Sequence, residues 1–465
     1  MDDTFRRRRS PPGFCRFVLV PDQPRLRRAA DPREARGLDI DLLQIDPPCR
    51  RRRTTMCSLL RLPLYDCRWH GHFQVCQTSS AGVLMQEGLF LYNHGLSPYD
   101  GGVFHQAPLL LPLFSLLPDP ARYPLVTVLL YTLVDLASAY ALMQIFASGQ
   151  SYASRFFTSS RESKRWSSSA VAAAHLFNPF VVLTCLARST NVFGNLFILV
   201  SVLKACRGAA FGSAFALALA SYMSLHPLLL LPPLAVLCYD SSIMRNKNAS
   251  KDGRNSALVP FAAKYTAVFA VAIAILFALS YALTGNWSFI SSVYASRLLL
   301  PDLTPNVGLW WYFFIEIFDS FRNFFLGVFW LHMVSYSPAL IIRLRDQPLA
   351  AVVLMCGIFA IFQPYANVGD AGFWLSLLSM YGHVHELSRY AFPAISALIY
   401  TTLLGPAFYY LWVYAGSGNA NFFYAITLVW SLALSVILAD MLYAIIRDEW
   451  EKERPEMKGK EARQI

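Results

Sequence analysis

Residues 414–428 read YAGSGNANFFYAITL, and this stretch interrupts a very apolar C-terminal half with small and amide side chains. Ala391–Val413 before it and Phe422–Ile446 after it are each long enough to cross a hydrocarbon core of about 30 Å at about 1.5 Å per residue. The interruption is therefore expected at a membrane face, where Asn419 and Asn421 supply hydrogen-bond donors and acceptors. Two interpretations stay open: a tight turn between two helices, or a polar surface for an amphiphilic ligand.

The composition extends this interpretation to the whole chain. Of 465 residues, 55% are hydrophobic and only 15% charged, well below the charged fraction of soluble domains. We therefore predict an all-α, polytopic membrane protein. The net charge of +11 could indicate a nucleic-acid partner, but the basic residues gather in the N-terminal segment and in short loops between apolar runs. That distribution signals membrane topology, so no nucleic-acid partner is expected.

Residues 1–80 differ in composition from the remainder. They contain Arg6–Arg9 and Arg50–Arg53 and have no apolar run of membrane length, which predicts disorder. Asp39 and Asp41 form an acidic pair that we interpret as a solvated patch. Five of the nine cysteines also lie here, without the paired spacing of metal ligands. We expect no zinc site and no cofactor.

Residues 81–450 form the expected multispanning domain, followed by a charged tail at residues 451–465. The run Leu109–Leu117 is too short to cross a membrane and is expected to be interfacial or re-entrant. Eleven or twelve transmembrane helices are predicted in all. The eleven ranges are Tyr123–Phe146, Ala170–Ala187, Val192–Leu203, Phe211–Met223, Leu225–Tyr239, Phe261–Leu283, Leu309–His332, Leu349–Phe362, Ala371–His383, Ala391–Val413 and Phe422–Ile446.

Basic residues in the loops predict the orientation. Four loops and the tail after Arg447 carry Lys and Arg and are assigned to the cytoplasm, which makes the C-terminus cytoplasmic. With eleven spans the arginine-rich N-terminus would then lie outside, against the charge rule. Residues 1–80 are therefore expected to replace a first transmembrane helix, unless the run near Leu109 spans. The loop residues are Arg155, Arg161, Lys164, Arg165, Lys204, Arg207, Arg245, Lys247, Lys251, Arg254, Arg343 and Arg345.

The other, non-cytoplasmic side collects the unusual polar turns. Besides the opening stretch, these turns are His94–His105, Arg188–Asn191, Ser224–Pro227, Gly285–Asn306 and Pro364–Asp370. Within them we select Asp100, His105, Asp302 and Asn306 as candidate polar contacts. Arg188, with the two hydroxyl residues after it, either binds a phosphate at a helix start or forms a turn behind a kink at Asn178-Pro179.

Glu316 and Asp319 lie within the predicted span Leu309–His332. An acidic side chain inside a membrane is costly unless it is paired or faces a wet cavity. A functional role and a structural role therefore both stay open for these two residues.

Five segments, in order and spacing, resemble the PIG-U family, a multispanning subunit of the GPI transamidase of the endoplasmic reticulum. They are HGLSPYDGGVFHQAPLL (94–110), LFNPFVVLTCLARST (176–190), SLHPLLLLPP (224–233), PDLTPNVGLWWYFFIEIF (301–318) and the opening stretch. The resemblance does not cover residues 1–80.

The resemblance implies a non-catalytic subunit, because in that complex the nucleophilic cysteine belongs to another, protease-like subunit. It also implies the other transamidase subunits as partners and presentation of the GPI glycolipid. On this chain the implied lipid contacts are Asn419 and Asn421, flanked by Phe422, Phe423 and Tyr424.

An enzyme is the alternative. Polytopic mannosyltransferases that use dolichol-phosphate sugars have a similar appearance, and their first luminal loop can resemble residues 97–110. They need an acidic residue just after the first helix, a place that neither Asp39 nor Asp41 occupies. A transporter would show an internal repeat, and no convincing repeat is present.

Overall fold

The computed structural model describes residues 78–100, 104–118, 122–245 and 257–460, all of which belong to the compact unit Pro63–Ile465. The described part is helical, with one isolated antiparallel bridge between Ala153 and Thr158. This confirms the all-α class. The expectations for residues 1–77, including those for Asp39 and Asp41, lie outside the described residues.

The helices of the N-terminal half are α2 (Thr78–Asn93), α3 (Leu110–Ser115), α4 (Pro124–Ala147), η1 (Glu162–Lys164), α5 (Ser168–Leu176), α6 (Pro179–Leu186), α7 (Asn191–Cys206), α8 (Ala210–Met223), η2 (His226–Leu230) and α9 (Leu231–Arg245). Those of the C-terminal half are α10 (Leu258–Thr284), η3 (Ile290–Ala295), α11 (Ser296–Leu299), α12 (Trp310–Glu316), α13 (Asp319–Arg343), α14 (Pro348–Phe362), α15 (Val368–Leu378), η4 (Ser379–Leu387), α16 (Ala391–Val413), α17 (Ala420–Glu453) and η5 (Pro455–Met457).

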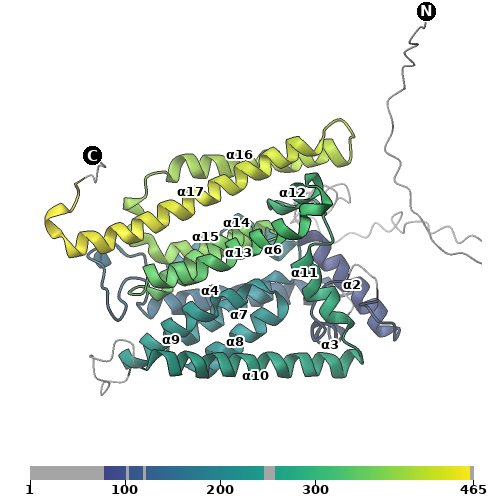
Figure 1. Ribbon diagram of the computed structural model, residues 1–465, viewed down its shortest axis with the longest axis horizontal. Helices are drawn as coiled ribbons and strands as arrows, with labels where there is room; N and C mark the ends of the chain where they lie inside the picture. Colours follow the sequence, from purple (N-terminus) through teal and green to yellow (C-terminus); the bar gives the residue numbers. More distant parts are fainter. Residues whose placement is uncertain (1–77, 101–103, 119–121, 246–256, 461–465) are drawn as a thin grey trace, which may run out of the picture. The chain divides into compact units, whose positions relative to one another are not determined.

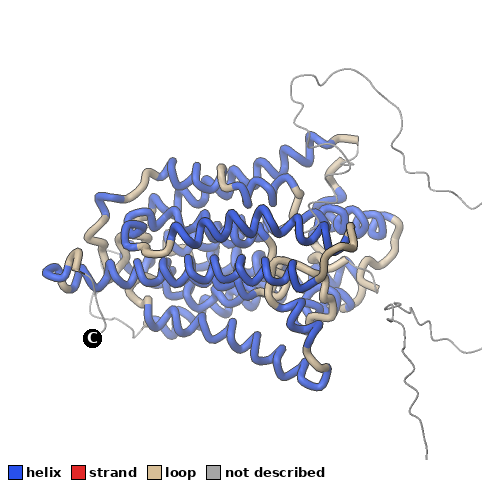
Figure 2. Tube along the Cα trace, turned by 90° about the horizontal axis from the view of Figure 1, so that it is seen from above, coloured by secondary structure: helices blue, strands red, loops and turns tan. Residues whose placement is uncertain are grey.

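Helix α14 forms the centre of the bundle. Every side chain from Pro348 to Ile361 is buried, and the helix packs against α9, α13, α15 and α17. A helix that is apolar all round is expected to be buried in this way. Figure 1 shows α16 and α17 on one side of it, and α4, α7, α8 and α10 on the other. The long helices run side by side, and the loops gather at the two ends of the bundle (Figure 2).

Among the described residues, six helices are long and apolar enough to cross a membrane: α4, η2 with α9, α10, α13, α16 and α17. The bent pair α5 and α6 makes a seventh. Helices α7, α8 and α14 are apolar but shorter, and α14 owes its apolar sequence to burial in the bundle. A polytopic helical membrane protein is confirmed. The predicted number of eleven spans is not confirmed. Several of the predicted spans correspond to helices that are too short to cross a bilayer on their own.

Two predicted spans are broken. The chain bends by 51° between α5 and α6, where the Asn178 side chain accepts a hydrogen bond from the backbone N–H of Phe180 and Pro179 starts the new helix. This agrees with the predicted kink. The continuous helix predicted over Leu309–His332 is wrong, because α12 ends at Glu316, Ile317 and Phe318 have extended backbone, and α13 begins at Asp319.

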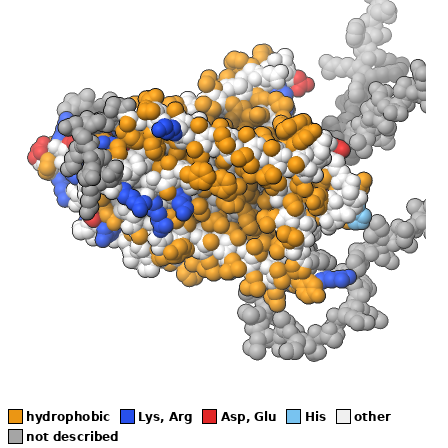
Figure 3. Space-filling model, turned by 90° about the horizontal axis from the view of Figure 1, so that it is seen from below, with side chains coloured by type: hydrophobic (Ala, Val, Ile, Leu, Met, Phe, Trp, Pro, Cys, Tyr) orange, Lys and Arg blue, Asp and Glu red, His pale blue; other side chains and the backbone are white. Residues whose placement is uncertain are grey.

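The basic loops meet at one end of the bundle. Asp240 at the end of α9 pairs with Arg155 at 3.2 Å and with Arg345 at 2.5 Å. Arg161 pairs with Asp448 at 2.8 Å and with Glu451 at 2.5 Å, both on α17. Figure 3 shows Lys and Arg toward this end and hydrophobic side chains over the middle of the visible face. The basic loops at residues 155–165 and 343–345 therefore lie together with the end of α17.

Candidate functional site

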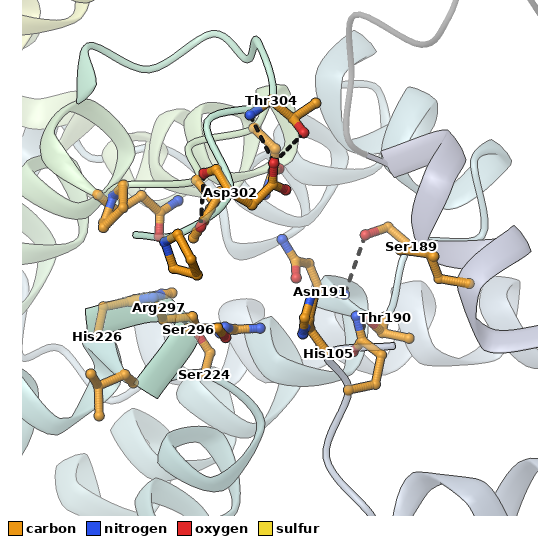
Figure 4. A pocket seen from close by; sticks show the side chains of 18 of the residues that line it. His105, Ser189, Thr190, Asn191, Ser224, His226, Ser296, Arg297, Asp302 and Thr304 are labelled. Atoms are coloured by element: carbon orange, nitrogen blue, oxygen red, sulfur yellow. Dashed lines mark hydrogen bonds between the residues drawn. The ribbon is translucent and has the colours of Figure 1, made fainter. Parts of the chain in front are cut away.

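A cavity of about 500 Å³ lies at the other end of the bundle. Residues from five of the polar turns assigned to the non-cytoplasmic side line it, so the fold brings together segments that are distant in sequence. The lining includes His105, Gln106, Ser189, Thr190, Asn191, Ser224, His226, Ser296, Arg297, Pro301, Asp302, Thr304, Gln363, Pro364, Tyr365 and Asn367. Figure 4 shows the side chains of these turns around a common space.

Hydrogen bonds between segments hold the cavity wall. Nδ1 of His105 donates to the carbonyl oxygen of Ser292 at 2.8 Å. Thr190 donates from its hydroxyl to the side-chain oxygen of Gln106 at 3.0 Å. At another part of the wall, the hydroxyl of Ser224 lies 2.8 Å from Nδ1 of His226. These side chains are therefore fixed before any ligand enters, which reduces the entropy lost on binding.

Asp302 occupies the segment that connects α11 to α12. Its carboxylate accepts hydrogen bonds from the backbone N–H of Thr304 at 2.9 Å and from the hydroxyl of the same residue at 2.5 Å. Its carbonyl oxygen accepts from the hydroxyl of Tyr365 at 3.0 Å. Of the described residues that line the cavity, Asp302 is the only acidic one.

Arg297 brings a positive charge to the cavity. It lies on the short helix α11, after the π-helical turn η3. Leu300 ends α11 in the left-handed region at φ 51°, and the side chain of Arg322 donates to its carbonyl oxygen at 2.5 Å. Backbone irregularities of these two kinds recur at functional sites.

The Arg297 side chain is half-buried. Burial lowers the pKa of its guanidinium below the ordinary value, while Tyr294, Tyr365 and Asp370 act in the opposite direction. The guanidinium makes no hydrogen bond or ion pair with any described residue.

The opening stretch lies at the start of α17. Gly416 takes a positive φ of 62° in the turn, and Asn419 caps the helix by accepting from the backbone N–H of Phe422 at 3.2 Å. Asn421 is exposed, and its side-chain oxygen accepts a hydrogen bond from the hydroxyl of Tyr312. The helix-turn interpretation is thus confirmed for Asn419, and the ligand-surface interpretation stays a prediction.

The three aromatic residues after Asn421 have different environments. Phe422 is 55% exposed, whereas Phe423 is 1% exposed and packs with Trp311 and other aromatic residues. Tyr424 stacks on Tyr312 with ring centroids 4.3 Å apart and donates to the carbonyl oxygen of Leu309 at 3.3 Å. Of the three, only Phe422 has an exposed ring, and Phe423 is a core residue.

One continuous segment of the chain connects the cavity with the start of α17. Residues 301–304 line the cavity, and the same segment continues into α12, where Tyr312 contacts Asn421 and Tyr424. At the start of α12 the indole N–H of Trp310 donates to the carbonyl oxygen of Phe362 at 2.8 Å, beside the cavity residue Gln363. The cavity and the start of α17 therefore share one end of the bundle.

Several predicted polar contacts lie outside the cavity lining. Asp100 is exposed. Arg188 has a positive φ of 53° and accepts at its carbonyl oxygen from Tyr131 at 2.7 Å. Asn306 is 1% exposed and accepts from the backbone N–H of Gly308 at 2.7 Å, so it shapes the turn.

Glu316 and Asp319 are exposed on either side of the break between α12 and α13. The expectation that they lie inside one membrane helix is wrong, because that helix is interrupted between them. His105 and Asp302 do line the cavity, as do Ser189 and Thr190 after Arg188.

Sequence reasoning did not select Arg297 or Asn191. One signal could have found Arg297: an arginine in a turn assigned to the non-cytoplasmic side contradicts the positive-inside rule and needs a local reason. Asn191, at the first position of α7, had no comparable signal.

The cavity and the start of α17 both lie in the part of the chain that matches known proteins. Residues 62–430 match the family model described as PIG-U, GPI transamidase subunit PIG-U. This chain belongs to the PIG-U family. The human protein named GPI-anchor transamidase component PIGU is 35% identical over 393 residues, which cover 81% of this chain and 88% of that protein.

Two yeast relatives extend the PIG-U comparison. The Saccharomyces cerevisiae protein named GPI transamidase component GAB1 is 33% identical, with 81% of this chain and 88% of that protein covered. The Schizosaccharomyces pombe protein named as its homolog is 30% identical, with 84% and 91% covered. The match to the PIG-U family includes the cavity, α12 and the start of α17.

Proposed function

We propose that this chain is a non-catalytic subunit of a GPI transamidase in the endoplasmic reticulum membrane, where it binds the GPI glycolipid and presents it for attachment to proteins. Membership of the PIG-U family and the names of the relatives support the subunit role. The partners are the other transamidase subunits, including the protease-like catalytic one. The C-terminus is cytoplasmic in this proposal, because the basic loops gather at its end of the bundle.

The observation that carries the lipid-binding role is the exposed amide of Asn421 beside the exposed ring of Phe422. An amide offers both donors and acceptors to sugar hydroxyls and phosphate oxygens. Aromatic side chains at a membrane interface suit the boundary between headgroup and acyl chains. Asn421 and Phe422 therefore fit the two halves of an amphiphilic ligand.

A mannosyltransferase needs a carboxyl group free to move a proton. The only acidic residue among the described cavity residues is Asp302, which lies between α11 and α12 and not just after a first helix, where such an enzyme needs its acid. We therefore propose no transferase activity for this chain.

The test is made in cells that lack the endogenous subunit and carry a GPI-anchored surface reporter. A chain with Asn419→Ala and Asn421→Ala is expected to insert, to co-purify with the other subunits and to display the reporter at a reduced level. Asn93→Ala, at an exposed asparagine that ends α2, is the matched control and should display it normally. Normal display by the double variant would refute the lipid-binding role.

A further inference from the structure

We infer that the cavity is a binding site for a phosphorylated polyol, with Arg297 as its phosphate-binding group. This inference rests on the proposed function and deepens it, since it assigns the phosphate-bearing headgroup of the glycolipid to a site separate from Asn421. The phosphate could reach the cavity on a membrane lipid or on a soluble sugar phosphate, and the experiment below distinguishes the two.

The charge of the lining favours an anion. Arg297 is the only Lys or Arg among the described lining residues, and no described residue forms a hydrogen bond or an ion pair with it. A half-buried cation without a partner is costly, and an anion removes that cost. The planar guanidinium matches two phosphate oxygens at once, which favours phosphate over a simple halide.

The carboxylates near Arg297 do not replace that anion. Asp302 lines the cavity but accepts two hydrogen bonds from Thr304. Asp370 acts on Arg297 only through space, because its carboxylate accepts from the side chain of Gln363 and from the backbone N–H of Asn367 at 3.1 Å. Both hydrogen bonds to Asp302 use its Oδ1, and neither Asp302 nor Asp370 forms an ion pair with Arg297 among the described residues. The guanidinium therefore stays available to a ligand.

The remainder of the lining favours hydroxyl groups on the ligand. Asn191 contributes a side-chain amide that makes no hydrogen bond with any described residue. In Figure 4, Asn191, Thr190 and His105 lie on one side of the cavity, and Arg297, Ser296 and His226 on the other. A ligand that contacts both sides needs an anionic group at one end and hydroxyls at the other.

The size of the cavity agrees with such a ligand. Its volume of about 500 Å³ lies within the range of small-molecule sites, roughly 300–1,000 Å³. That volume accommodates one sugar or cyclitol ring with a phosphate. We therefore take inositol 1-phosphate as the probe.

The experiment uses the full chain in phosphatidylcholine nanodiscs and follows its thermal unfolding midpoint. Inositol 1-phosphate is expected to raise the midpoint, inorganic phosphate to do so only at about tenfold higher concentration, and uncharged inositol to have no effect. Arg297→Gln should raise the Kd for inositol 1-phosphate by about tenfold or more. Arg122→Gln, at an exposed arginine outside the cavity, should leave it unchanged.

A second variant tests the polyol half of the site. Asn191→Ala should weaken the binding of inositol 1-phosphate but leave the binding of inorganic phosphate unchanged. This comparison holds even if Arg297→Gln does not fold. Equal stabilisation by charged and uncharged inositol, or unchanged binding in a folded Arg297→Gln chain, would overturn the inference.

Nanodiscs that contain phosphatidylinositol show whether the bound phosphate belongs to a membrane lipid or to a soluble sugar phosphate. If the lipid headgroup enters the cavity, the lipid will compete and raise the Kd of the soluble probe; without competition, the ligand is a soluble sugar phosphate. Reporter display separates this inference from the proposed function. If Arg297→Gln loses probe binding but displays the reporter normally, the site stands and its link to GPI attachment fails.

Discussion

Tyr312 on α12 donates a hydrogen bond to the side-chain oxygen of Asn421, although 109 positions separate the two residues. The contact fixes the orientation of an exposed amide. It also connects the start of α17 to the segment that lines the cavity, because α12 continues directly from residues 301–309. One continuous segment therefore contacts both the cavity and the start of α17.

Tyr312→Phe tests whether Asn421 or its partner contacts the lipid. The substitution removes the hydroxyl but keeps the ring stacked on Tyr424, so it should cost about 1 kcal/mol of stability or less. We expect Tyr312→Phe to lower GPI attachment less than Asn421→Ala does, as measured by surface display of a reporter. The reverse order would assign the contact to Tyr312.

The Asn419 side chain should contribute to stability through its helix cap. Asn419→Ala removes the acceptor for the backbone N–H of Phe422 and should destabilise the start of α17 by about 1 kcal/mol. Asn419→Ser keeps a capping oxygen and should restore most of that loss. Thermal unfolding in detergent measures both, and equal midpoints for the two variants would contradict the cap.

Arg161 should be essential for folding at the basic end. Its guanidinium pairs with Asp448 and Glu451, and all three side chains are buried. Arg161→Gln leaves two buried carboxylates with less compensation and should cost about 3 kcal/mol or more. Arg165→Gln breaks an exposed pair with Glu162 and should cost less than about 1 kcal/mol. Similar losses in thermal stability would contradict this difference.

Gly372 should not tolerate a side chain. A Cβ atom there would lie 2.7 Å from the Cβ of Phe180 and 3.0 Å from the backbone nitrogen of Val181, where α15 packs on α6. Gly372→Ala should destabilise by about 1–3 kcal/mol. Gly194→Ala, on α7 with nothing within 4 Å, should be neutral or stabilising by up to about 1 kcal/mol. The thermal unfolding midpoints of the two variants measure this difference, and equal midpoints would contradict the predicted clash at Gly372.

The orientation can be tested in sealed microsomes with a membrane-impermeant maleimide. A cysteine at Lys458, after α17, should react without detergent, because the basic end is expected to face the cytoplasm. A cysteine at Asn286, just after α10, should react only once the membrane is opened. The opposite pattern would invert the topology.

The sequence predicted which polar turns lie at one end of the bundle but did not single out Arg297. Loop charge alone assigned His105, Asp302 and the turn after Arg188 to one side, and the fold brings them around one cavity. Arg297 was missed, because a side chain becomes a binding group only when its neighbours leave it without a partner. Asn306 was selected for its polarity, yet its hydrogen bond to Gly308 makes it part of a turn.

The sequence by itself determined the helical membrane class and the family, because these depend on composition and on motif order along the chain. Its charges also predicted which polar turns lie at the same end of the bundle. Only the tertiary structure decided that α14 is a core helix, that α12 and α13 are separate, and that five turns enclose a cavity. Apolar runs look alike whether they face lipid or protein. Their environment depends on which helices pack around them, and that depends on contacts between residues far apart in the chain.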